Sequence, residues 1–410
     1  MSQLASSPRP VAKIRLQRLS TIVAVVVVLI FVVRLAQLLA VSAGTLGTDT
    51  AGYFEGGQRL RAGLPLYRSQ LDLAREPFTF IYPPPLALLF TVFPSYPAAV
   101  WGWAAFSIAC WLAALWLIAR ELRGDLWPRL PAEWRPVLLA ALIDFPPALS
   151  HLVWGQVQLL LLLLLTGAWL CLRRRREGWA GALIGAAIAF KLFPALVLVP
   201  LVAARRWRAA AGAVLSAAAI LAVSFVPAGW GQLAYYLTVV LPQVNRVSVT
   251  EHIYNHALPV LLRAVIPSAA AASALDWAIR LAVLGAVALG GWRLKDAPDR
   301  ALSLGMIALV LVPTVVWQHY FVLLYLPLLT ALASVSRRRL PWLILAFCLI
   351  ATASLAYNVP VRLVPAAVCL PIAGTALLLL IQLDQLWRDS LSMRSRTGHS
   401  ASSERADDRR

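Results

Sequence analysis

Long apolar runs, interrupted by short clusters of arginine, follow one another through most of this chain of 410 residues. Hydrophobic residues make up 60% of the sequence and charged residues 13%, and the mean hydropathy is +0.75. A helix that crosses a bilayer needs roughly 20 apolar residues, and only structures that satisfy their own backbone hydrogen bonds can span hydrocarbon. The sequence therefore predicts an all-α polytopic membrane protein without a sizeable soluble domain.

The arginine clusters give the expected orientation of these runs, because cytoplasmic loops carry an excess of Lys and Arg. Clusters at 120–135, 173–176, 205–208, 293–300 and 337–339, and the tail after the last run, are assigned to the cytoplasm. One topology satisfies all of them, with both termini inside. It predicts about twelve crossings, at 19–41, 97–119, 136–151, 155–172, 178–190, 193–204, 209–226, 269–292, 301–316, 319–335, 341–357 and 363–387. Topology thus explains the net charge of +19, and no nucleic-acid partner is expected.

The predicted organisation is a single membrane domain with short basic ends. Residues 1–18 form a cytoplasmic arm, 19–387 the membrane domain, and 388–410 a disordered basic tail. The first apolar run is longer than the signal-peptide core of about 7 to 15 residues and contains an arginine, so an uncleaved span is expected. The first outer loop covers 42–96. Its end, Ile81–Tyr96, is short and flanked by prolines, which favours a juxtamembrane or re-entrant helix.

The first outer loop also holds the residues best suited to chemistry. Its polar stretch Gly47–Leu88 contains Asp49, Glu55, Tyr67 and the run Tyr82–Pro85. A loop of this length has to form a structured cap on one membrane face. Asp49 would then lie just beyond the first span, where a carboxylate stays ionised near lipid head groups. The alternative is that Asp49 caps a helix over TAGYFEGGQRLR, and the residues alone leave both interpretations open.

Polar groups from distant parts of the chain reach the same face in this topology. Lys191, in AIAFKLFP, falls at the outer tip of a hairpin formed by 178–190 and 193–204. It either snorkels to the interface or binds a lipid-borne phosphate. Other segments predicted on the outer face are His151–Gln156, 229–256, Trp317–Tyr320 and 358–362.

Other charged or metal-binding patterns have simpler explanations. His252 and His256 are four residues apart but belong to no HExxH pattern, and Gly-rich nucleotide loops and a GxSxG elbow are absent from the sequence. The four cysteines lie in or beside apolar runs without CxxC spacing. We therefore expect neither a metal nor a cofactor. Asp276 and Arg280, also four residues apart, are expected to form an ion pair on one helix face.

Several segments occur in an order typical of a known family: an Asp after the first span, AGLPLY, IYPPPLALL, WGQVQLLLLLLL and GALIGAAIAFKLFPALVLVPLVAARRWRA. This order resembles glycosyltransferase family 87, integral membrane enzymes of the GT-C superfamily that use polyprenyl-phosphate sugars as donors. The family includes mannosyltransferases and arabinofuranosyltransferases of mycobacterial envelope synthesis. The likeness covers residues 20–335 and implies a GT-C type helix bundle with a structured first outer loop.

The resemblance also implies roles for individual residues. Asp49 matches the catalytic Asp of the first outer loop, the general base that deprotonates the acceptor hydroxyl in an inverting transfer. His319 matches the His of the family's WDH segment. The resemblance and the predicted topology assign donor or phosphate binding to Lys191, Tyr82, Gln156, Asn255, His256 and Arg246. Two positions depart from the pattern, because Gln318 and Gln158 stand where the family has Asp and Asn.

The resulting hypothesis is a multi-pass enzyme of a bacterial plasma membrane with its active site on the extracytoplasmic face. It would transfer a hexose, mannose first among the candidates, from a polyprenyl-phosphate donor to a lipid-linked or glycan acceptor, with inversion and without metal; membrane lipids are the other expected partner. Two alternatives remain. A transporter or flippase of polyprenyl-linked precursors would show internal symmetry and a site near the middle of the membrane. A non-catalytic subunit would retain the fold, and the altered Gln158 and Gln318 are compatible with it.

Overall fold

The computed structural model describes residues 10–41, 47–69, 79–250 and 254–407, and these residues form helices and connecting turns without any strand among them. The predicted all-α class is therefore confirmed for the described chain. The helices of the N-terminal half are α1 (Pro10–Val41), α2 (Thr48–Arg61), α3 (Pro84–Phe90), α4 (Tyr96–Glu121), α5 (Arg123–Leu126), α6 (Arg135–Ile143), α7 (Pro146–Trp154), α8 (Gln158–Arg173), α9 (Glu177–Phe190) and α10 (Leu198–Ala203).

The C-terminal half contains further long helices and several short helical turns. Its α-helices are α11 (Trp207–Ala228), α12 (Gly231–Tyr235), α13 (Leu241–Thr250), α14 (Leu258–Val265), α15 (Ala269–Arg293), α16 (Pro298–Leu311), α17 (Tyr325–Ser334), α18 (Leu340–Ala351) and α19 (Val364–Asp407). The short 3₁₀ segments of the described chain are η1 (Ala132–Trp134), η2 (Phe193–Val197), η4 (Gln318–Leu324), η5 (Thr352–Asn358) and η6 (Val361–Leu363), and η3 (Tyr236–Val240) is a π-helical turn.

Six helical stretches of the described chain are long and apolar enough to cross a membrane, by length and composition. They are Tyr96–Glu121, Ala132–Trp154, Trp207–Ala228, Ala269–Arg293, Leu340–Asn358 and Val361–Arg388. Shorter apolar helices lie where other crossings are predicted; these are Gln17–Ile30, Gln158–Arg173, Glu177–Phe190, Phe193–Ala203 and Gln318–Ser334. The protein is thus a multi-pass membrane protein, and the count of about twelve crossings stays a prediction.

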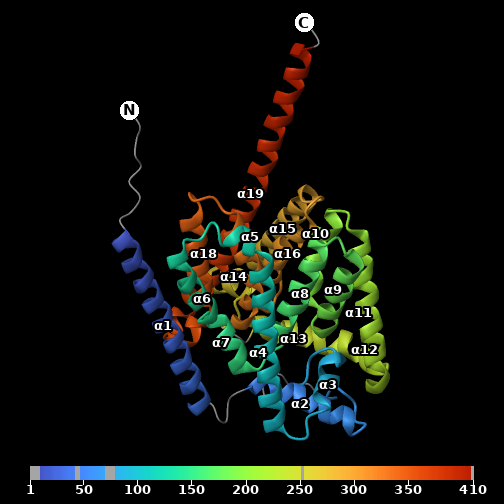
Figure 1. The fold of residues 1–410 in the computed structure, drawn as a ribbon. Coiled ribbons are helices and arrows are strands. Elements are labelled where there is room, and N and C mark those ends of the chain that lie inside the picture. The colour runs from blue at the N-terminus through green and yellow to red at the C-terminus, as the bar shows by residue number, and fades with distance from the viewer. Residues whose placement is uncertain (1–9, 42–46, 70–78, 251–253, 408–410) are drawn as a thin grey trace.

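The bundle has two distinct ends, which we call the α2 end and the α5 end (Figure 1). Helices α2 and α3 lie at the first of these ends. At the opposite end lies α5, and there α1 begins and α19 leaves the bundle (Figure 1). Helix α3 has only 7 residues and begins at the proline run, so it is too short to cross and packs beside α2. Within the predicted segment Ile81–Tyr96 the chain therefore forms a short helix and does not span.

Helix α4 begins beside α3 because local sequence signals define its start. The Ser95 side chain accepts a hydrogen bond from the backbone N–H of Ala98, with 3.4 Å between the two atoms, and Pro97 occupies the first turn. An N-cap serine and an early proline favour helix initiation since neither leaves a backbone donor unsatisfied. Helix α4 packs on α8 and runs from the α2 end to the α5 end, where α5 follows it (Figure 1).

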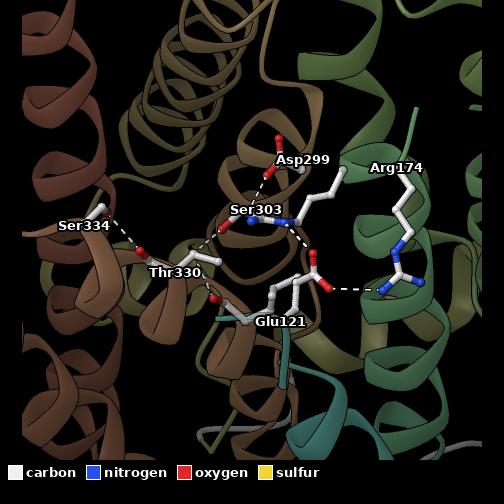
Figure 2. Close-up of polar contacts among 8 residues, drawn as sticks. Glu121, Arg174, Asp299, Ser303, Thr330 and Ser334 are labelled. Atoms are coloured by element: carbon white, nitrogen blue, oxygen red, sulfur yellow. Dashed lines mark hydrogen bonds and ion pairs between the residues drawn. The ribbon is translucent and has the colours of Figure 1, made fainter. Parts of the chain in front are cut away.

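Arginine–carboxylate pairs join the helices at the α5 end. Glu121, at the end of α4, accepts hydrogen bonds from Arg173 at 3.1 Å and from Arg174 at 3.2 Å. Arg173 also donates to Asp299, at the start of α16, at 3.2 Å. Figure 2 shows Glu121 and Asp299, the two carboxylates that Arg173 joins. Charges at this end thus connect α4, α8 and α16 directly.

Two hydroxyl groups continue the polar contacts at the α5 end. The Oγ of Ser303 and the Oγ1 of Thr330 lie 2.9 Å apart, and Ser334 donates to the Thr330 carbonyl at 2.9 Å (Figure 2). These groups and Arg173 line a cavity of 280 Å³. Every one of these polar side chains has a protein partner, so the contacts bind α16 to α17.

A buried ion pair stabilises α15. Arg280 donates to Asp276 with 2.7 Å between Nε and Oδ1, and both residues are 6% exposed. The pair joins residues one helical turn apart, as predicted from their spacing. Both charges are therefore neutralised inside their own helix.

Helix α19 extends further than the sequence predicts. It continues to Asp407 and so includes the described residues, 388–407, of the tail for which composition predicts disorder, and its last turns project away from the bundle (Figure 1). A physical reason is that its N-terminal part packs on α18 and supplies a formed nucleus. Adding further helical residues to an existing helix costs far less than nucleating a new one.

Candidate active site

A cavity of 430 Å³ lies at the α2 end, and it brings together five of the predicted site residues. They come from five separate segments of the chain and are Asp49, Tyr82, Gln156, Lys191 and His319. The remainder of the lining is mostly apolar or aromatic, and much of it comes from α13, the segment 313–317 and the neighbours of Tyr82 and Lys191 in the sequence. A largely apolar cavity of this size with a few convergent polar groups has the form of a small-molecule site.

Asp49 lies in the first turn of α2, and its side chain does not cap that helix. The N-cap position is Gly47, which has a left-handed conformation with φ of 70°, and the helix start has no side-chain cap hydrogen bond. The Oδ2 atom of Asp49 instead accepts a hydrogen bond from the side-chain amide of Gln156. Its location in the cavity and not at the helix cap favours the chemical interpretation of this carboxylate over the capping one.

The start of α2 is held against the break between α7 and α8. The backbone N–H of Gly47 donates to the carbonyl of Val153 at 2.6 Å, and Thr50 Oγ1 donates to the carbonyl of Gly155 at 3.3 Å. The indole N–H of Trp103, from α4, donates to the same Gly155 carbonyl at 2.9 Å and to that of Gln156 at 3.1 Å. These bonds place Gln156 beside Asp49.

Gly155 is required for this close approach. It has a φ of 67°, which L side chains rarely adopt. A Cβ atom built there would lie 2.0 Å from Thr50 Oγ1 and 2.9 Å from the Cα of Gly47. The sequence WGQ therefore ends α7 and lets two backbone segments touch, which no other residue type would allow without displacing α2.

The Gln156 side chain connects four polar groups and is only 3% exposed. Its Oε1 accepts hydrogen bonds from the Tyr53 hydroxyl at 2.9 Å and from the Lys191 ammonium at 3.3 Å. Its Nε2 donates to Asp49 and, at 3.3 Å, to the Tyr82 hydroxyl. An ammonium only donates and a carboxylate only accepts, so this orientation of the amide is the one that satisfies both charges.

Lys191 lies in the break between α9 and η2, at the hairpin tip where the sequence places it. Its Nζ is 5.2 Å from the ring centroid of Tyr82 and 4.7 Å from that of Tyr320. Cation–π contacts of this kind hold an ammonium that has left water. Burial lowers the pKa of Lys191 to about 7, against the opposing effect of the Asp49 carboxylate.

The environment of Asp49 makes it a stronger base than an ordinary aspartate. Burial raises the pKa of Asp49 to about 6, although the Gln156 amide and the Lys191 charge both act to lower it. The carboxyl group is thus mainly ionised at neutral pH and binds a proton more tightly than a solvated carboxylate. A general base with a pKa near the working pH is the most effective kind.

His319 lies in the cavity wall with unsatisfied ring nitrogens. The residue is 2% exposed, and neither Nδ1 nor Nε2 has a hydrogen-bond partner within the described part of the chain. Its ring centroid is 6.5 Å from that of His151. Buried polar atoms without partners are costly, so the His319 ring is a natural contact for a bound polar ligand.

The other predicted site residues lie behind or beside the cavity. Asn255 donates to the Thr314 carbonyl at 2.9 Å and accepts from the backbone N–H of Val316 at 2.8 Å. His256 approaches the Val368 carbonyl with Nδ1 at 3.2 Å. The Asn255 side chain therefore holds the wall segment 313–316, whereas His256 reaches it through its backbone N–H, which donates to the Val316 carbonyl at 2.7 Å, and its ring contacts α19. Arg246 is an exposed residue of α13 and is not part of the cavity lining, and His252 lies outside the described residues.

Two tyrosines of the site were not predicted from the sequence. Tyr53 holds the Gln156 amide, and it follows Asp49 by four positions on α2, so the helical i, i+4 spacing would have revealed it. Tyr320 supplies one of the two rings around Lys191, and it directly follows His319. No local pattern links Tyr320 to Lys191, because the contact depends on how η4 packs against η2.

The chain is similar to a family of known membrane enzymes. The sequence profile of glycosyltransferase family 87 matches residues 80–317. The chain is 29% identical over 357 residues to a polyprenol-phosphate-mannose-dependent alpha-(1-2)-phosphatidylinositol mannoside mannosyltransferase of Mycolicibacterium smegmatis, covering 77% of this chain and 76% of the relative. A protein of the same description from Mycobacterium tuberculosis is 30% identical over 281 residues, covering 65% and 64%.

A third relative differs in its described acceptor. The phosphatidylinositol pentamannoside mannosyltransferase of Mycolicibacterium smegmatis is 29% identical over 328 residues, covering 77% of this chain and 76% of the relative. The family profile covers more than half of the chain and includes the residues that form the cavity from Tyr82 to Trp317. The chain belongs to glycosyltransferase family 87 and is a membrane glycosyltransferase.

Proposed function

We propose that the protein transfers mannose from polyprenyl-phosphate mannose to a lipid-linked or glycan acceptor, with inversion, on the extracytoplasmic face of the membrane. The observation that carries this proposal is the Asp49 carboxylate at the polar end of the 430 Å³ cavity, with Lys191 beside it. The names of the relatives support the choice of donor, since all three are described as dependent on polyprenol-phosphate-mannose.

The orientation follows from the basic clusters. Helix α8 ends at Arg173 and α9 begins at Glu177, so the arginines at 173–176 belong to a connection at the α5 end. Positively charged connections favour the cytoplasmic side. The α2 end, with the cavity, then faces the other side of the membrane.

The chemistry assigns separate tasks to the two charged residues. Asp49 removes the proton of the acceptor hydroxyl as the oxygen attacks the anomeric carbon of the sugar. The bond between that carbon and the phosphate oxygen breaks, and the polyprenyl phosphate leaves with the bonding electrons. Lys191 stabilises the negative charge that develops on the phosphate, because an ammonium in a water-poor site acts strongly on nearby charge.

The rest of the cavity suits the other parts of the substrates. Apolar residues of α13, among them Leu241 and Val244, complement an isoprenoid chain. On the same cavity, the rings of Tyr254 and Tyr357 stack with centroids 4.5 Å apart, and such rings combine an apolar face with a hydroxyl. We assign the sugar hydroxyls to His319. A phosphatidylinositol mannoside, named for the relatives, is the first acceptor to test.

The test is sugar transfer from radiolabelled polyprenyl-phosphate mannose by membranes that contain wild-type protein or Asp49→Asn, with donor binding measured in parallel. Loss of the general base is expected to lower the rate about 100-fold or more while donor binding is retained. Asp125→Asn, the same change at an exposed position of the α5 end, is the control and should leave transfer unchanged. Equal transfer by wild type and Asp49→Asn would remove Asp49 from the mechanism. No transfer by wild type from a panel of donors would refute the proposed function.

A further inference from the structure

The Gln156 amide stands between the two charges of the site and uses its full hydrogen-bonding capacity. A primary amide offers two N–H donors and two acceptor lone pairs, and here they meet Asp49, Tyr82, Tyr53 and Lys191. The carboxylate and the ammonium thus both contact this one neutral group. No direct ion pair between Asp49 and Lys191 occurs in the described structure.

We propose that Gln156 is a positioning residue that acts as a neutral spacer, keeping the Asp49 carboxylate and the Lys191 ammonium from forming a direct ion pair. This inference rests on the proposed function, in which Asp49 must accept a proton and Lys191 must attract a phosphate. A direct pair would satisfy both charges with each other. With the spacer, each charge keeps hydrogen-bonding capacity for substrate.

The hydrogen-bond inventory supports this division. Within the described residues, Asp49 accepts a single side-chain hydrogen bond, on Oδ2, so Oδ1 remains available to the acceptor hydroxyl. Among the same residues Lys191 makes a single hydrogen bond, to Gln156, so two of its three N–H groups remain for a phosphate. Both residues line the cavity, where a substrate can reach them.

The spacer is fixed before any substrate binds. Trp103 donates to the Gln156 backbone carbonyl, and Gly155 holds the preceding peptide against α2. The Tyr53 hydroxyl then holds the amide oxygen, and Tyr53 itself is fully buried and is not part of the cavity lining. An amide held at its backbone and at its oxygen has no freedom to turn aside and let the two charges meet.

The titratable groups that face Asp49 come from every neighbouring element. Lys191 is the charged one; the others are the phenols of Tyr53, Tyr82, Tyr96, Tyr320 and Tyr357, which are neutral at physiological pH. Substitution of Gln156 therefore changes the pKa of Asp49 by two opposed effects: loss of the amide hydrogen bond raises it, and a closer approach of Lys191 lowers it, so the sign of the change tells which one dominates.

The test replaces the amide with a side chain of similar length and no hydrogen bonds, in Gln156→Met. The protonated carboxyl band of Asp49 is followed by infrared difference spectroscopy against pH, with Asp49→Asn to identify the band. In wild type the midpoint is expected near pH 6. In Gln156→Met the ammonium moves onto the carboxylate, and the midpoint is expected to fall by about one pH unit or more. Transfer should fall with it, because the base is weaker and the ammonium is occupied.

The opposite sign would overturn the inference. If Gln156 only donates a hydrogen bond to the carboxylate, its loss raises the midpoint, and a purely structural role leaves the midpoint where it is.

The double variant Gln156→Met/Lys191→Met should titrate above wild type, because no ammonium remains. If Gln156→Met does not fold, Gln156→Asn, whose shorter amide cannot reach both charges, should show the same downward direction. The infrared titration does not depend on transfer, so a shifted midpoint in a protein that transfers no mannose would refute the proposed function alone.

Discussion

The cavity at the α2 end and the cluster of ion pairs at the α5 end use charged side chains in opposite ways. At the α5 end, Glu121 and Asp299 bind arginines directly, with donor–acceptor distances of 3.1 to 3.2 Å. At the α2 end, Asp49 and Lys191 contact the same amide and not each other. The first arrangement satisfies charge and joins helices, whereas the second leaves charge available. The difference shows that pairing, and not the mere presence of charge, separates structural from chemical sites in this protein.

The largest expected effect comes from removing the unpaired cation. Lys191→Met should lower mannose transfer about 100-fold or more, since loss of one group that stabilises a developing anion typically costs 10²- to 10³-fold in rate. Lys295→Met makes the same change at an exposed position of the α5 end and should have little effect. Equal losses of activity in Lys191→Met and Lys295→Met would contradict the distinction between the cavity and the ion pairs of the α5 end. Initial rates at saturating donor and acceptor provide the measurement.

A smaller effect is expected from separating α2 from the break between α7 and α8. Gly155→Ala introduces a Cβ atom that would lie 2.0 Å from Thr50 Oγ1, so α2 must shift and the carboxylate must leave its amide. We expect a loss of about 10-fold in transfer and of about 2 kcal/mol in stability. Thermal unfolding in detergent and initial rates would be measured together.

Gly63→Ala is a matched control for the backbone strain in Gly155→Ala. Gly63 also has a positive φ, of 66°, but a Cβ atom there meets nothing within 4 Å. The strain of a left-handed alanine, about 1 kcal/mol, is thus present in both variants, and the steric contact only in one. Equal losses in the two variants would show that the contact with Thr50 is unimportant.

The smallest effect should come from breaking a pair at the α5 end. Glu121→Gln removes the charge that binds Arg173 and Arg174, and partly exposed ion pairs contribute about 0 to 1 kcal/mol. Mannose transfer is expected to stay within about 2-fold of wild type, since each kcal/mol lost here acts on stability and not on the reacting groups. A loss of transfer comparable with that of Lys191→Met would contradict the distinction between the two ends.

The sequence was sufficient to predict where the chain breaks. Proline, glycine and isolated polar residues in WGQVQ and AFKLFP interrupt apolar runs, and the structure ends α7 at Trp154 and α9 at Phe190 as these signals suggest. The resemblance to the family then directed attention to Asp49. Convergence of Asp49, Gln156 and Lys191 was predictable because sidedness depends on local charge, which can be read along the chain.

The contacts between these residues were beyond prediction. Asp49 and Gln156 are separated by 107 positions, and the bond between them depends on a glycine approach that only the folded chain reveals. Asn255 was assigned to donor binding, yet its side chain bonds to backbone groups of the cavity wall. An amide side chain resembles a peptide group, so sequence alone cannot distinguish a ligand contact from a backbone brace.

The contact between Gly155 and the start of α2 also makes Asp49 part of the helix bundle, although its position in the sequence is in the first outer loop. The backbone N–H of Gly47 donates to the Val153 carbonyl, and the Trp103 indole donates to the Gly155 carbonyl. Helix α2 also packs on α4 and α7. The position of the Asp49 backbone therefore depends on the same packing that holds these helices together, so a change that loosens α4 or α7 is expected to disturb the cavity as well.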